Sequence, residues 1–185
     1  MGKGNRLINL FHKVIDFLEK HQIEYVLIGG LAVDVWGLPR KTNDIDAVIL
    51  STPDHYDEFL RQAKRAGFQG ESQKLQMQLN KMGMCRLNYQ RLHADFIMGY
   101  SNFEKEVFLR KRKVSLFGRK VWVASPDDII LYKILAAREI DKADIKNIII
   151  AQGKNLDKAY LRSRVKLMQH ELNRFDMVKT LEKYL

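Results

Sequence analysis

Residues 25–46 contain the feature that most restricts how this chain can fold. The apolar run from Tyr25 to Ile28 ends at Gly29-Gly30, and a short amphipathic stretch follows from Leu31 to Trp36. The chain then enters Asp44-Ile45-Asp46 and further apolar residues. This order predicts a strand, a tight glycine turn, a short helix, a loop and a second strand.

The polar residues of this stretch indicate a chemistry. Asp44 and Asp46 are expected to project from one face of the second strand, because alternate residues point to the same side. Paired carboxylates supply the oxygen ligands that hard divalent cations prefer, and such ions often share their coordination with substrate phosphates. Gly29 and Gly30 lack a Cβ, so their backbone N–H groups can approach an anion near the start of a helix. Together these features indicate phosphoryl or nucleotidyl transfer.

Each half of the pattern also has an ordinary explanation. A Gly-Gly pair is usually only a turn, and a lone Asp-x-Asp is usually surface acid. Here the two are joined by thirteen residues in a strand–turn–helix–strand order, which makes the combination specific.

The pattern resembles the signature of the polymerase-beta-type nucleotidyltransferases. The fuller string resembles their minimal bacterial and archaeal branch, which includes the AbiEii-type toxin nucleotidyltransferases. The matching positions are Gly29-Gly30-Leu31-Ala32, Gly37, Arg40, Thr42 and Asp44-Ile45-Asp46. At Gly30 this superfamily often has a serine whose hydroxyl helps to hold the phosphates, so only backbone donors remain here. The resemblance covers about residues 20–150 and implies an α/β (α+β) nucleotidyltransferase fold, a small mixed sheet flanked by helices.

A third acid is expected, because two metal ions need more oxygen ligands than two carboxylates supply. Asp95 lies among apolar residues in the predicted strand 92–98. The resemblance agrees, since the third carboxylate of that superfamily lies on a later strand and helps to deprotonate the acceptor hydroxyl or to hold the metal. The alternative is an acid on the exposed face of a strand.

The resemblance also implies roles for the site residues. Asp44, Asp46 and Asp95 would bind two Mg²⁺ ions, and Thr42 would orient the loop entering Asp44. The NTP phosphates would contact Gly29, Gly30, Arg40 and Lys133.

Lys133 enters this set because Asp127–Lys133, followed by Arg138, Asp141 and Asp144, resembles the helical region of the same enzymes. There, Asp141 would orient Lys133 or Arg138. A solvated helix face with salt bridges is the alternative.

The rest of the chain completes a layered arrangement. Apolar spacing predicts a helix over 5–21, and a glycine-containing turn at 117–119 predicts a hairpin. Alternation of Leu75, Met77 and Leu79 predicts an edge strand within 69–83. Ser125-Pro126-Asp127-Asp128 is a helix start, and the chain from there to the C-terminus is expected to be helical. We therefore expect a catalytic core over 1–124 and a helical C-terminal section over 125–185.

Charge bears on the acceptor. A formal net charge of +10 attracts polyanions, which favours RNA, with tRNA as in the toxin relatives, although a highly charged solvated surface is the alternative. A protein side chain or a small hydroxyl compound such as an aminoglycoside stays open as acceptor. So does a non-catalytic nucleotide- or RNA-binding module of the same fold. The resemblance allows a cognate antitoxin partner. A single cysteine and the lack of a membrane-spanning run predict a cytoplasmic protein without membrane contact.

Overall fold

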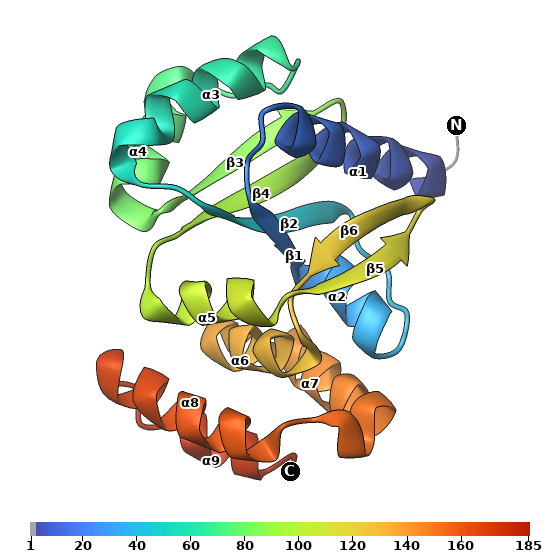
Figure 1. Ribbon diagram of the computed structural model, residues 1–185, viewed down its shortest axis with the longest axis vertical. Coiled ribbons are helices and arrows are strands. Elements are labelled where there is room, and N and C mark those ends of the chain that lie inside the picture. The colour runs from blue at the N-terminus through green and yellow to red at the C-terminus, as the bar shows by residue number, and fades with distance from the viewer. Residues whose placement is uncertain (1–2) are drawn as a thin grey trace. The chain divides into compact units, whose positions relative to one another are not determined.

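The computed structural model describes residues 3–185, and the strands within them form one mixed six-stranded sheet (Figure 1). The strands are β1 (Tyr25–Ile28), β2 (Asp44–Leu50), β3 (Met84–Tyr89), β4 (Leu92–Gly99), β5 (Arg112–Leu116) and β6 (Arg119–Val123). Their order across the sheet is β3-β4-β2-β1-β6-β5. β2 pairs with β4 and β1 pairs with β6 in parallel, while the other neighbours are antiparallel. The predicted α/β class, a mixed sheet flanked by helices, is confirmed.

Helices make up most of the remaining described chain. They are α1 (Lys3–Lys20), α2 (Gly29–Trp36), α3 (Tyr56–Arg65), α4 (Ser72–Met82), α5 (Asn102–Arg110), α6 (Pro126–Ala136), α7 (Glu139–Gln152), α8 (Lys158–Glu171) and α9 (Met177–Glu182). Two short 3₁₀ turns cover Pro53–His55 and Gly153–Asn155. Within residues 3–185, no helix has the length and apolar character needed to cross a membrane.

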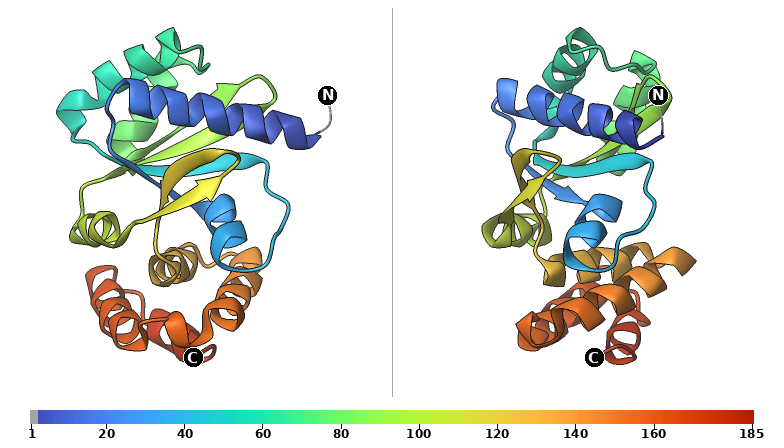
Figure 2. Two further views of the ribbon diagram at one scale, coloured as in Figure 1. Left: turned by 45° about the vertical axis from the view of Figure 1, so that its right-hand side comes forward. Right: turned by 90° about the vertical axis from the view of Figure 1, so that its right-hand side faces the viewer.

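The chain divides into two compact units. The first combines the chain up to Leu31 with Lys41–Ala124 and contains the sheet. The second combines Ala32–Arg40 with Ser125–Leu185, and its C-terminal segment is helical without a strand (Figure 2). Ser125 opens that segment as its sequence predicts, because its Oγ accepts a hydrogen bond from the backbone N–H of Asp128.

One face of the sheet in the first unit is covered by packed aromatic side chains. Phe17 of α1, Phe59 of α3 and Phe96 of β4 form a cluster, with ring centroids 5.6 Å apart for Phe17–Phe59 and 5.2 Å for Phe59–Phe96. All three rings are buried, which stabilises the fold by roughly 1.5–3 kcal/mol for each side chain. Phe96 pairs with Ala47 of β2, so both residues face α1. The residues just before them, Asp46 and Asp95, therefore lie on the opposite face.

The edge strand predicted within 69–83 is wrong, because Ser72–Met82 forms helix α4. Leu75 and Leu79 are four residues apart and buried, whereas Met77 between them is 55% exposed, which is the helical rather than the alternating pattern. The segment is rich in the helix-forming residues Gln, Lys, Leu and Met and has no β-branched residue. Gly83 ends the helix in the left-handed conformation, with φ of 61°.

Candidate active site

The three predicted carboxylates lie on one face of the sheet in the first unit. Asp46 of β2 is the register partner of Asp95 of β4, and Asp44 is the partner of His93. Because neighbouring strands are about 4.8 Å apart and alternate residues share a side, the pairing brings Asp44, Asp46 and Asp95 together. Asp95 is the most enclosed, at 7% exposed.

Asp44 is oriented by its neighbours. The Thr42 hydroxyl donates a hydrogen bond of 2.7 Å to Asp44 Oδ1, so the loop entering β2 aims this carboxylate. The other oxygen, Oδ2, lies 3.8 Å from Nε2 of His93. Thr42 therefore lies beside Asp44, and its orienting role stays a prediction.

Asp46 lies directly against the glycine turn. Gly29 has φ of +65°, and a Cβ added there would lie 1.8 Å from Asp46 Oδ2. Only glycine fits this position, both for its backbone conformation and for the space that the carboxylate fills. Gly29 opens α2, so the carboxylate lies at the positive end of that helix. Gly30 follows as a buried helical residue.

Arg86 of β3 is a member of this cluster that the sequence patterns did not single out. Its Nε donates to Asp95 Oδ1 at 2.8 Å and its Nη2 donates to Asp95 Oδ2 at 2.7 Å. These hydrogen bonds raise the pKa of Arg86, and the charges of Asp95, Asp44 and Asp46 raise it further. The alternation of residues 84–89 indicates a strand. The contact of Arg86 with Asp95, however, follows only from the pairing of β3 with β4.

The donor set suits a hard divalent cation only in part. Asp44 and Asp46 offer carboxylate oxygens from one strand face, which is the chemistry that Mg²⁺ requires. Both oxygens of Asp95, however, are bound by Arg86. Accordingly, within residues 3–185 no group of three or more His, Cys, Asp or Glu side chains is arranged to hold a metal. Asp44 and Asp46 would supply two of the oxygen ligands of a first cation, whereas Asp95 is engaged by Arg86.

Two other predicted phosphate contacts, Arg40 and Lys133, lie in the second unit and meet at Asp144. Lys133 Nζ is 2.7 Å from Asp144 Oδ2 and 3.0 Å from Asp141 Oδ1. Arg40 Nε is 3.0 Å from Asp144 Oδ1, and the Arg40 backbone N–H donates to Asp34 Oδ1 at 2.8 Å. Lys133 is only 3% exposed.

This ion network attaches the segment Ala32–Arg40 to α6 and α7. Burial by itself raises the pKa of Asp141, but hydrogen bonds from Arg138 and Lys133 outweigh it and hold that pKa below its usual value. Asp141 thus contacts both Lys133 and Arg138, and its orienting role stays a prediction. The phosphate-binding roles of Arg40 and Lys133 stay predictions, and both side chains are engaged with Asp144.

The contact between Gly29 and Asp46 predicts an unequal response to alanine. Gly118 also has positive φ, +78°, but a Cβ there would meet nothing within 4 Å. Gly118→Ala should therefore lower the free energy of unfolding by about 1–2 kcal/mol, the cost of left-handed backbone alone. Gly29→Ala should cost clearly more, because Asp46 must also move. Urea unfolding followed by circular dichroism measures both variants. Equal decreases in the free energy of unfolding would mean that the Asp46 side chain moves aside without an energetic cost.

The burial of Lys133 predicts a structural effect. Lys133→Met should lower the free energy of unfolding by about 3–5 kcal/mol, because it leaves two buried carboxylates without this partner. Lys142→Met is the matched control, since Lys142 pairs with Glu139 on the exposed face of α7 and should change stability little. Chemical denaturation measures this. A Lys133→Met variant of normal stability but weaker NTP binding would show that Lys133 acts on phosphate instead.

Comparisons with known proteins agree with this fold. The profile of a family described as nucleotidyltransferase of unknown function (DUF6036) matches residues 5–184. A search of curated proteins gave no match.

Several solved structures share the architecture. The antibiotic-resistance factor ANT(2″)-Ia has a TM-score of 0.61 at 16% identity, covering 91% of this chain and 98% of that chain. The lincosamide antibiotic adenylyltransferase LnuA has a TM-score of 0.52 at 18% identity, with coverage of 75% and 93%. An antigenic nucleotidyltransferase-like protein from Paracoccidioides brasiliensis has 0.52 at 19%, with coverage of 95% and 92%. At such identities the similarity concerns the fold.

The AbiEii-type branch stays a prediction, whereas membership of a nucleotidyltransferase family is shown by a profile that spans nearly the whole chain. The chain belongs to the DUF6036 family of nucleotidyltransferases and is an enzyme of that class.

Proposed function

We propose that this enzyme transfers a nucleoside monophosphate from an NTP to a hydroxyl group of RNA, with Mg²⁺ as cofactor. The observation that carries the proposal is the register of β2 and β4, which aligns Asp46 with Asp95 on the face that also carries Asp44. The close approach of Asp46 to Gly29 adds the start of a helix to the same place.

In this reaction the acceptor oxygen bonds to the α-phosphorus, the bond from that phosphorus to the bridging oxygen breaks, and pyrophosphate leaves. Two Mg²⁺ ions, when bound, neutralise the triphosphate and activate the acceptor hydroxyl. Asp44 and Asp46 would hold the metal, and the Thr42 hydroxyl orients Asp44 through its hydrogen bond. The N–H groups at Gly29 and Gly30 face the phosphates. Asp95 serves the acceptor side, as a metal ligand or by taking the hydroxyl proton.

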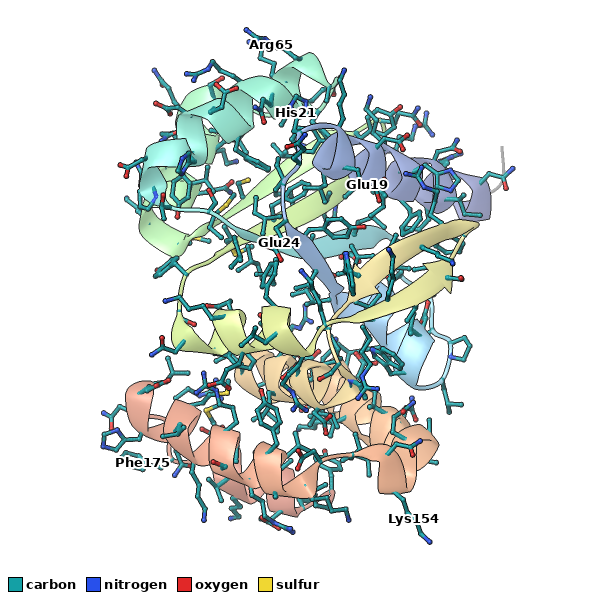
Figure 3. The ribbon with its side chains drawn as sticks, in the orientation of Figure 1. Glu19, His21, Glu24, Arg65, Lys154 and Phe175 are labelled. Atoms are coloured by element: carbon teal, nitrogen blue, oxygen red, sulfur yellow. The ribbon has the colours of Figure 1, made fainter. Side chains whose placement is uncertain are left out.

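The charge of the chain supports RNA as the acceptor. A net charge of +10 attracts a polyanion and disfavours a polycation such as an aminoglycoside. Many basic side chains are already engaged within their own unit. In the first unit, Lys111 contacts Glu24, and Arg119 is 2.7 Å from both Asp16 and Glu19 of α1. Figure 3 labels the two acids Glu19 and Glu24. In the second unit, Arg164 is buried and Arg162 is bound by Glu182.

The β5–β6 hairpin carries exposed basic side chains. Arg112, Lys113 and Lys120 are exposed there, and Lys113 lies over the half-buried ring of Trp122 at 5.2 Å. The register relates this surface to the carboxylates: Leu27 pairs with both Ala47 and Val123, so Trp122 lies on the sheet face of Asp46. Lysines around an aromatic ring suit the phosphates and bases of a single strand. Lysines on an edge strand also discourage aggregation, which is the competing explanation.

The proposal predicts a transfer that depends on Asp46. With Mg²⁺, each α-labelled NTP in turn and total tRNA, the wild-type enzyme should label RNA. Asp46→Asn should reduce labelling at least about a hundredfold, because removing a preorganised charge in an active site costs on the order of 10²–10³ in rate. Circular dichroism should show an unchanged fold, since the substitution keeps the shape of the side chain. Wild-type labelling by Asp46→Asn would contradict the site.

Parallel reactions with different acceptors distinguish RNA from the other acceptor classes. Tobramycin, lincomycin and a protein extract replace tRNA in turn, and label on one of these instead of RNA would move the acceptor to that class. RNA binding should weaken at least tenfold between about 50 and 200 mM salt through counterion release, whereas NTP binding should fall much less. NTP binding without transfer to any acceptor would favour the non-catalytic module. A cognate antitoxin partner is expected only if tRNA is the acceptor.

A further inference from the structure

Arg86 holds the carboxylate that the proposed chemistry needs. It is the cross-strand partner of Asp95, and its guanidinium binds both carboxylate oxygens in a fork, at 2.8 and 2.7 Å. Such paired, charge-assisted hydrogen bonds are among the strong ones in proteins. A cation that approached Asp95 would find both oxygens already engaged.

Arg86 and Asp95 differ in how exposed their side chains are, and therefore in how freely they can move. The side chain of Asp95 is 10% exposed, whereas that of Arg86 is 52% exposed. Arg86 also lies on β3, an edge strand of the sheet. The arginine can therefore rotate into solvent about its long stem while the carboxylate stays in place.

Arg86 also acts as a counterion for the three carboxylates of the cluster. Its guanidinium feels the charges of Asp44 and Asp46 in addition to that of Asp95, and so offsets part of the repulsion among three carboxylates. A divalent cation would perform the same task, so the two are alternatives at Asp95.

We propose that Arg86 competes with the second divalent cation for Asp95, so that Asp95 becomes a metal ligand only after Arg86 lets go. This inference rests on the proposed function. It means that the protein without nucleotide holds one cation on Asp44 and Asp46. Asp95 would accept the second cation only with the NTP present, once Arg86 has released its carboxylate.

A purely structural role for Arg86 makes the opposite prediction. If the guanidinium only fixes the rotamer of Asp95, its removal loosens that side chain and weakens metal binding. The direction of the change in affinity therefore separates the two roles.

The test is Mn²⁺ binding to the full chain without NTP or acceptor, followed by electron paramagnetic resonance of the free ion. Wild type should bind one Mn²⁺. Arg86→Met should bind a second, with overall affinity about tenfold tighter, the order expected when a competing charge within about 5 Å is removed. Arg65→Met is the matched control, because Arg65 is an exposed arginine at the end of α3, outside the carboxylate cluster. It removes the same charge and should leave the stoichiometry at one.

Two further variants keep the test decisive. Arg86→Lys keeps the charge but not the two-pronged hydrogen bonding, so its Mn²⁺ affinity should lie between those of wild type and Arg86→Met. If Arg86→Met fails to fold, Arg86→Lys takes its place in the test. In an Asp95→Asn background, removing Arg86 should have no effect on Mn²⁺ binding. Binding by Arg86→Met that is unchanged or weaker would overturn the competition and leave Arg86 as a positioning residue. No Mn²⁺ binding by any variant, with or without NTP, would overturn the proposed function itself.

Discussion

The parallel pairing of β2 with β4 is the constraint on which the proposed site depends. A slip of one residue would turn Asp95 toward α1 and bring Phe96 among the carboxylates, because side chains alternate between the faces of a strand. Phe96 is held against Phe17 and Phe59 by aromatic contacts on the covered face. Apolar packing on one side of the sheet thus fixes the alignment of polar groups on the other, and a site of three acids can persist despite their mutual repulsion.

The connection into β2 is secured at both ends, each within its own unit. Arg40 is bound to Asp144 and Asp34 in the second unit, and Thr42 is hydrogen-bonded to Asp44 in the first. Buried ion pairs add little net stability, yet losing one partner is costly. The arrangement therefore specifies where the segment 32–40 lies more than it stabilises the fold.

Local signals in the sequence were sufficient for the predictions that depended on neighbours along the chain. The turn at Gly29, the aspartates of β2 and the helix start at Ser125 could be predicted because propensity and spacing act over a few residues. Arg86 could not, since its role arises from the pairing of β3 with β4. The strand predicted within 69–83 was wrong because Leu75 and Leu79 satisfy both a period of two and a helical spacing. The burial of Lys133 was also unpredictable, because the same i, i+3 charges suit a solvated helix.

The central claim is that Asp44 and Asp46 hold a metal ion beside the bound nucleotide. Its most direct test is anomalous scattering from a crystal grown with Mn²⁺ and a non-hydrolysable NTP analogue. The account predicts a manganese peak coordinated by carboxylate oxygens of both residues, with the triphosphate beside Gly29 and Gly30. Manganese bound to the triphosphate with neither carboxylate as a ligand would contradict it, as would a nucleotide bound elsewhere on the chain.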